Sequence, residues 1–295
     1  MLMAHTKKVM LVVLSLLLVM PIYSRKSLPI GHFFTVDASL GYSNIFESYQ
    51  DLETEGTIGG LFGINYELRK KRFLFTTGIE GQMLTANSIY EITDFDVPIY
   101  DTQGKFATMH YQVGIVDERT RLVYASIPIM FGYYGYGFYI GAGAKIGLPI
   151  VPIVKSQYNY TTSATYPEYV EDFENMNNHD YDAFDKLSNY RMKVPIKYSV
   201  VVEIGYNLLN KSSMGIDDPR HGLRISAVCE YGLNNLMNTP ADGTLYEITP
   251  TNATELTMLP YYVSHSTENQ HINHFYAGLK ITWTFRLSKG DCDCD

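Results

Sequence analysis

The residues best suited to chemistry lie in one acidic stretch in the second half of the chain. Between positions 168 and 185, seven carboxylates stand among Tyr, Phe and Asn side chains. Carboxylates at this density can bind Ca²⁺ or Mg²⁺, or attract a basic partner. Their spacing does not match an EF-hand loop, and a loop kept in solution by its charge is the alternative interpretation. The seven residues are Glu168, Glu171, Asp172, Glu174, Asp180, Asp182 and Asp185.

Three histidines form a second candidate group near the C-terminus. His265, His271 and His274 stand close together in the sequence, with Glu268 between the first two. A His-x-x-His pair can ligate a metal, but a spacing of three does not place both side chains on one face of a strand. We therefore predict structural or solvated histidines, no metal site and no catalytic residue.

The cysteines offer little chemistry. Cys292 and Cys294 lie near the end of the chain, and two thiols without a nearby histidine make a poor metal site. A disulfide across one residue would be strained, so we predict a short periplasmic tail over 288–295. Cys229 is expected to face lipid as a small apolar side chain. Three cysteines in 295 residues are too few for a disulfide scaffold, and no cofactor is predicted.

The first 24 residues have the pattern of a secretory signal peptide. Lys7 and Lys8 precede an apolar run over 9–20, and Ser24 offers a small residue for cleavage. The run is too short for a transmembrane anchor. The mean hydropathy of −0.09 argues against several membrane helices, and the net charge of −8 argues against a nucleic-acid partner.

The remainder alternates apolar and polar residues with a period of two, which indicates strands. Each segment is about the 9–11 residues that a tilted membrane strand needs, with an apolar face and a small, polar face. The pattern alone also fits a soluble sandwich. The eight segments are 32–44, 57–68, 72–83, 122–133, 138–147, 196–208, 222–232 and 274–287.

The connections between these segments separate the two architectures, because they alternate between short and long. The long ones cover 45–56, 84–121, 148–195 and 233–273. Short periplasmic turns and long outer loops are typical of outer-membrane barrels. We therefore predict an all-β, eight-stranded antiparallel up-and-down transmembrane β-barrel over 25–287. Parts of the long loops are expected to continue the strands, with Tyr111, Val113 and Ile115 on the outward face of segment 122–133.

Charged residues fall on the predicted inner face in nearly balanced numbers. An eight-stranded barrel is just wide enough for its side chains to fill, so a diffusion pore is excluded for a monomer. Buried charges persist only when paired, which predicts a lumenal salt-bridge network; a catalytic carboxylate pair or a proton path is the alternative. The predicted network is Asp37, Glu80, Lys145, Lys197, Glu203, Arg224, Glu230, Lys280 and Arg286.

The last strand resembles the signal that the barrel-assembly machinery recognises. That signal has a polar or aromatic residue, a glycine two positions later, and alternating apolar residues that end in an aromatic. The usual form ends the chain, whereas here ten residues follow the last aromatic. The matching residues are Tyr276, Gly278, Ile281, Trp283 and Phe285.

Two further stretches, 124–130 before a Tyr/Gly turn and 138–145 after it, extend this resemblance. With the last strand, they resemble the PorT-like outer-membrane β-barrel family of Bacteroidota-type bacteria, within the small barrels of the OmpA/OmpX type. The resemblance covers about 30–287 and implies a link to protein secretion across the outer membrane. Its motifs describe barrel construction rather than chemistry.

These features predict a non-enzymatic protein of the Gram-negative outer membrane. It would present acidic, Tyr-rich loops and serve structure, adhesion or an envelope assembly such as secretion. Its expected partners are outer-membrane lipid, the barrel-assembly machinery and envelope proteins. The alternative is a barrel enzyme acting on lipid or protein, for which a Glu80→Gln or His271→Ala variant that folds normally would lose its phenotype.

Overall fold

The structure is a computed structural model, and almost all of the residues it describes lie in strands. It describes residues 31–46, 53–70, 72–92, 94–100, 104–135, 137–167, 173–174, 183–208, 221–236, 246–248, 256–258 and 272–288. No helix among these residues is long and apolar enough to span a bilayer. The signal peptide, the C-terminal tail, His265 and His271 lie outside the described residues.

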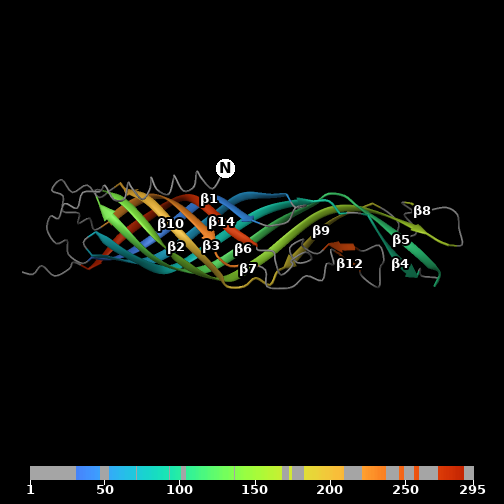
Figure 1. The fold of residues 1–295 in the computed structure, drawn as a ribbon, viewed down its shortest axis with the longest axis horizontal. Coiled ribbons are helices and arrows are strands. Elements are labelled where there is room, and N and C mark those ends of the chain that lie inside the picture. The colour runs from blue at the N-terminus through green and yellow to red at the C-terminus, as the bar shows by residue number, and fades with distance from the viewer. Residues whose placement is uncertain are drawn as a thin grey trace, which may run out of the picture.

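Eight long strands form a closed antiparallel ring (Figure 1). Each strand pairs with the next one around the ring, and β14 pairs with β1 to close it. All eight predicted strands are confirmed, most of them longer than predicted. The strands are β1 (Gly31–Phe46), β2 (Glu53–Lys70), β3 (Phe73–Tyr90), β6 (Val116–Gly135), β7 (Phe138–Thr165), β10 (Lys197–Asn207), β11 (His221–Gly232) and β14 (Asn273–Ser288).

Burial alternates along every ring strand, with apolar side chains outside and polar ones inside. On β1, Leu40 is 71% exposed whereas Asp37 is 1% exposed. On β3, Ile79 faces outward and its neighbour Glu80 is buried. A soluble sandwich would bury the bulky apolar side chains instead, so this arrangement excludes it. The fold is that of a transmembrane barrel, whose apolar face meets lipid.

One end of the barrel carries the tight connections, and we call it the turn end. β2 and β3 are separated by two residues there, and β6 and β7 meet in a turn in which Gly137 has a φ of 85°. Such a left-handed conformation favours glycine because it has no Cβ. The described ends of the chain also lie at this end, since His32 pairs with Ser288.

Further strands lie within the connections at the other end. β7 runs for 28 residues, far beyond its predicted end, and pairs there with β5, β8 and β9. We call these three strands, β4 and residues 153–165 of β7 the outer sheet, which projects away from the ring (Figure 1). The additional strands are β4 (Phe95–Tyr100), β5 (Phe106–Val113), β8 (Phe173–Glu174), β9 (Ala183–Arg191), β12 (Tyr246–Ile248) and β13 (Leu256–Met258).

The outward orientation predicted for Tyr111, Val113 and Ile115 is wrong for the first two. Tyr111 and Val113, on β5, are buried, and Ile115, between β5 and β6, is exposed. Val113 pairs with Tyr160, and Asp117 pairs with Gln157. The segment from β5 to β6 therefore has one residue more between these two pairs than the facing part of β7. The extra residue lies in the break between β5 and β6 and reverses which positions point outward.

The outer sheet has a hydrophobic core of its own. Tyr111, Tyr158 and Tyr160 are fully buried in it, and Phe95 stacks on Tyr111 with ring centroids 5.0 Å apart. The Tyr158 hydroxyl donates to the Leu256 carbonyl at 2.9 Å, and the Leu256 amide donates to the Tyr160 hydroxyl at 3.3 Å. β13 is thereby fixed against the inner face of the outer sheet.

Candidate functional site: the charged interior of the barrel

The barrel interior collects its charges because most of the charged residues sit between outward apolar neighbours on their strands. Lys280 lies between Leu279 and Ile281 on β14, and both of these are exposed. Burying the apolar faces in lipid therefore forces the alternate positions into the lumen. A charge placed there needs a partner, because an isolated ion in a low-dielectric interior is very costly.

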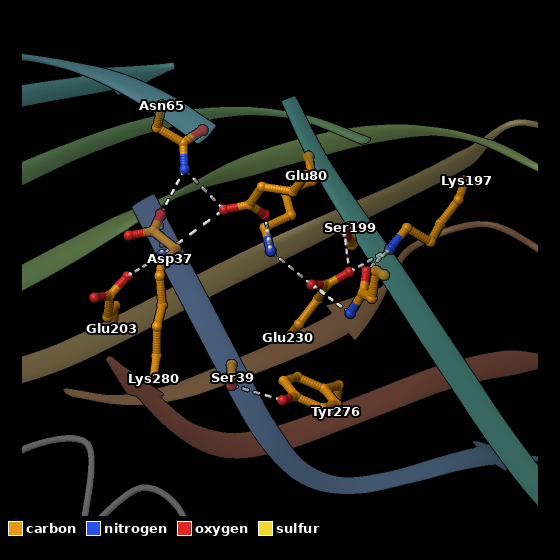
Figure 2. A network of polar contacts seen from close by, with 12 residues as sticks. Asp37, Ser39, Asn65, Glu80, Lys197, Ser199, Glu203, Glu230, Tyr276 and Lys280 are labelled. Carbon is orange, nitrogen blue, oxygen red and sulfur yellow. Dashed lines mark hydrogen bonds and ion pairs between the residues drawn. The ribbon is translucent and has the colours of Figure 1, made fainter. Parts of the chain in front are cut away.

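Glu230 of β11 is the centre of the part of the network nearest the outer sheet (Figure 2). Its carboxylate lies 2.6 Å from Lys197 Nζ and 3.1 Å from Lys145 Nζ. The Ser199 hydroxyl donates to it at 2.9 Å, and His274 Nε2 lies 3.3 Å away. Three other strands, β7, β10 and β14, thus contribute side chains to one carboxylate, which is fully buried.

Glu80 and Lys280 connect this part to the middle of the barrel. Lys145 Nζ lies 2.6 Å from Glu80, so this lysine joins two carboxylates. Lys280 Nζ lies 3.2 Å from Glu203, 3.3 Å from Asp37 and 3.7 Å from Glu80. One ammonium thereby links three carboxylates that arise on three different strands (Figure 2).

Amide side chains fill the gaps between these ions. Asn65 donates to Asp37 at 2.5 Å and to Glu80 at 3.4 Å (Figure 2). Gln82 donates to Glu230 at 3.0 Å and accepts a hydrogen bond from Lys197. Each amide joins charged groups on different strands: Asn65 through its two N–H donors, and Gln82 by donating to a carboxylate and accepting from an ammonium.

Arg224 extends the network to the turn end. Its Nε lies 3.7 Å from Glu203, and its Nη1 lies 3.1 Å from Glu67. Glu67 in turn pairs with Arg69 at 2.5 Å. The guanidinium of Arg224 also lies over the Tyr139 ring, 4.1 Å from its centroid, which adds a cation–π contact.

These contacts form one continuous charge network along the barrel axis. It contains five carboxylates and five basic side chains, so its formal charge is zero when His274 is neutral. Such pairing offsets the desolvation of the ions, and loss of one partner leaves an uncompensated buried charge. The members are Asp37, Glu67, Arg69, Glu80, Lys145, Lys197, Glu203, Arg224, Glu230 and Lys280, with His274 at the end nearest the outer sheet.

Eight of the nine charged residues predicted for the lumen meet in this network. The ninth, Arg286, lies half-buried near the turn end, where it is paired in register with Phe33. Glu67 was missed, although its position between the outward residues Tyr66 and Leu68 places it inside by the same alternation. Arg69 lies beyond the predicted end of its strand, so no sequence signal placed it.

Bulky aromatic side chains occupy the lumen beside the charges. Tyr124, Tyr139 and Tyr276 are each no more than 2% exposed. Lys197 Nζ lies 5.1 Å from the centre of the Tyr124 ring, and the Tyr276 hydroxyl is 2.6 Å from Ser39 Oγ (Figure 2). Because solvent barely reaches these groups, the interior at this level is packed rather than an open channel.

The residues of the proposed assembly signal divide between the two faces of β14. Tyr276 is buried inside, and a side chain at Gly278 would meet it there. Ile281 and Trp283 are exposed outside, and Phe285 lies on the same outward face. In the closed ring β14 is hydrogen-bonded on both sides, to β1 and to β11.

Most of the acidic stretch lies outside the described residues, including Glu168, Glu171, Asp172, Asp180 and Asp182. Glu174 is part of β8 and pairs with Ser163, and Asp185 is an exposed residue of β9 opposite Asn159. Cys292 and Cys294 also lie outside, whereas Cys229 is exposed on the outer face of β11. Among the described residues, no three His, Cys, Asp or Glu side chains are grouped so as to hold a metal ion.

An apolar outer surface and a paired, charged interior place this chain in the class of small eight-stranded transmembrane β-barrels. No protein-family model and no curated protein sequence matches it. Among solved structures, it is similar to Ail, the attachment invasion locus protein of Yersinia pestis, in complex with the heparin analogue sucrose octasulfate. That match has 8% identity and a TM-score of 0.32, and it covers 85% of this chain and 99% of Ail.

A second similar structure is that of Neisserial surface protein A (NspA). It has 9% identity and a TM-score of 0.29, and the match covers 84% of this chain and 95% of NspA. Similarity at this level says nothing of a ligand or an activity.

Proposed function

We propose that the protein is a non-enzymatic barrel of the Gram-negative outer membrane that anchors the outer sheet and presents it at the cell surface to a protein partner. The observation that carries this proposal is the continuity of β7, which is a wall strand of the barrel and then the central strand of the outer sheet. The barrel and the surface it presents are thereby one hydrogen-bonded unit.

The outward surface of the barrel supports the membrane placement. On β6 the outward residues from Val123 to Tyr133 are apolar or aromatic, and Ile127, Ile129 and Phe131 are strongly exposed. This length of strand matches the roughly 9–11 residues needed to cross a bilayer. The predicted signal peptide supports export, and the barrel form supports the outer membrane, where such barrels occur.

The packed interior supports presentation rather than transport. Lys197, Glu230 and Tyr124 are fully buried at the level where the lumen meets the outer sheet. A solute would have to break several buried ion pairs to pass, and each break leaves an unpaired charge. Among the residues that the structure describes, the outer sheet lies beyond the barrel wall and is available for recognition.

The partner that we propose belongs to an envelope assembly such as a secretion machine. This finer assignment is supported by the resemblance of 124–130, 138–145 and the last strand to PorT-like barrels. The predicted excess of acidic residues in the outer loops favours a partner with a basic surface.

The test removes the outer sheet and keeps the barrel. Tyr90 pairs with Val116, and Gln157 pairs with Leu187, so deletion of 93–113 and 158–186 leaves strand ends that short Gly-containing turns can join. The control variant lacks only 289–295. Both variants should fold, which is checked by faster migration of the unboiled protein in SDS gels.

The readout is cross-linking in intact cells from photoreactive residues at Gln112 and Asn189, two exposed positions of the outer sheet. We expect one dominant protein adduct from the control, and loss of the same partner on co-purification with the truncated barrel. No adduct from the control, or an undiminished partner with the truncated barrel, would contradict the proposal.

A further inference from the structure

A cluster of basic side chains lies on the outward face where the barrel joins the outer sheet. Arg119 and Arg121 are exposed on β6, Lys155 on β7 and Arg191 on β9. We call these four residues the basic band. They come from three adjacent strands, although 72 positions of sequence separate the first from the last.

The strand register places the four residues in two neighbouring rows. Arg119 is opposite Lys155, and Arg121 is opposite Ile153, which in turn is opposite Arg191. Paired strands lie about 4.8 Å apart, and successive outward residues on one strand lie about 6.6 Å apart. Four cationic heads on long side chains can therefore converge on one anionic group or on two adjacent ones.

The basic band lies immediately beyond the apolar surface of the barrel. On β6 the last outward apolar residue is Val123, and the next outward position is Arg121. On β7 the corresponding step is from Ile153 to Lys155. Long basic side chains at such a boundary lay their aliphatic stems on apolar surface and extend their charge into the headgroup layer.

The basic band differs from the interior in how its charges are compensated. In the lumen, Lys145, Lys197, Arg224 and Lys280 each lie within 4 Å of a carboxylate. Across the described part of the chain, none of the four band residues forms an ion pair, and Arg119 donates only to the Asn87 amide oxygen, at 3.3 Å.

Two nearby carboxylates share this face. Asp117 is at the next outward position beyond Arg119, opposite Gln157, and Glu55 of β2 is opposite Asn87, the residue that pairs with Arg119. They leave the four cations in excess. A surface with this excess of positive charge can bind an anion.

We propose that the basic band binds the phosphate groups of lipid headgroups in the outer leaflet, with phosphorylated glycolipid as the ligand. This inference rests on the membrane placement proposed above. Guanidinium groups bind phosphate oxygens through two parallel hydrogen bonds, and lysine adds a point charge. Anionic headgroups attract basic side chains that lie close to the membrane surface.

The overall charge of the protein favours a lipid over a dissolved anion. The chain has a net charge of −8, so soluble polyanions meet a repulsive field at long range. A headgroup anchored beside the barrel is already held within a few ångströms of the basic band, and its acyl chains pack against the apolar surface. The lipid therefore needs no long-range attraction.

The test is native mass spectrometry of the purified full chain in detergent micelles doped with lipid A. The variant Arg119→Gln/Arg121→Gln/Lys155→Gln/Arg191→Gln is compared with the unsubstituted protein and with Lys70→Gln, an exposed lysine at the turn end. We expect retained lipid A to fall about tenfold in the band variant and to stay within twofold in the Lys70 variant. Equal retention by all three proteins would overturn the proposal.

Two further arms identify the source of the phosphate. Lipid A without its phosphates should bind the unsubstituted protein weakly. The amount retained should match the amount of intact lipid A that the band variant retains. Excess inorganic phosphate should not displace intact lipid A, and complete displacement would instead assign the basic band to a free anion. Heat-dependent mobility in SDS gels reports the barrel separately, so failure of lipid binding is distinguishable from failure of the membrane placement.

Discussion

The ring of Tyr276 lies against Gly278, two positions further along β14 on the same inner face. A Cβ built on Gly278 would lie 2.6 Å from the Tyr276 hydroxyl oxygen and 2.7 Å from the Leu40 carbonyl oxygen. The same hydroxyl lies 2.6 Å from Ser39 Oγ on the neighbouring strand. The missing side chain at Gly278 therefore provides the space that lets Tyr276 reach across to β1.

We predict that Gly278→Val impairs formation of the barrel, because the added carbons displace both the phenol and the paired backbone. The expected loss of stability is about 1–3 kcal/mol, the usual cost of overpacking. It is measured as the shift in urea midpoint of the unfolding transition in detergent. The matched control is Gly81→Val, where the nearest atom to an added Cβ is 3.8 Å away. Equal effects at the two glycines would contradict the packing argument.

Removal of one central carboxylate should destabilise the barrel strongly. Glu230→Gln keeps the shape of the side chain but leaves Lys145 and Lys197 without their shared counter-charge. The expected cost is about 3–5 kcal/mol, typical of a buried ion pair that loses one partner. The loss of stability is measured by incubating the protein at increasing urea concentrations and following the fraction that still migrates as the folded barrel in unboiled SDS gels. Glu55→Gln, at an exposed position of β2, should change stability by less than about 0.5 kcal/mol.

Glu67 and Arg224 should show energetic coupling across the turn end of the lumen. Their charged groups lie 3.1 Å apart, on β2 and β11. Each single variant, Glu67→Gln or Arg224→Met, leaves a buried charge, whereas the double variant removes both. We expect the double variant to be more stable than the sum of the single effects predicts, by at least about 1 kcal/mol. Strict additivity in a double-mutant cycle would show that the pair does not act as a unit.

The position of Cys229 gives a test of the lipid-facing surface. In a background with Cys292→Ser and Cys294→Ser, its thiol is the only one in the chain. In proteoliposomes it should react with a membrane-soluble maleimide and remain unmodified by a charged one, because lipid covers the outer face of β11. Asn189→Cys in the same background, with Cys229→Ser, is the control, since this exposed residue of β9 should react with both reagents.

Rapid labelling of Cys229 by the charged reagent would place it in water. That result would contradict the placement of the outer face of β11 in lipid.

The strands of the ring were predictable because two independent constraints apply to each residue of a membrane barrel. Phe62 and Ile64 must meet lipid, and the positions between them must then meet the lumen, so a period of two persists over a whole strand. The same rule placed Asp37, Glu80 and Lys280 inside before any partner was known.

The outer sheet was not predictable in the same way, because beyond the apolar surface the lipid constraint ends. Tyr158 and Tyr160 are buried there by β13, which lies about 100 residues further along the chain and has no local signal. The break between β5 and β6 adds one residue beside Gly114, and a lone glycine in an alternating run can mark a bulge but does not establish one. The ion pairs also needed the structure, since an alternating pattern gives a side chain its face but not its partner.

The length of β7 has a mechanical consequence. From Ile153 to Thr165 the strand extends about 40 Å at roughly 3.3 Å per residue, with neighbours hydrogen-bonded on both sides for part of its course. A pull along this axis loads those bonds in shear, so they must fail together rather than one at a time. The tip of the outer sheet is therefore held at a nearly constant height above the membrane. A partner bound there can transmit force to the barrel without the outer sheet first extending.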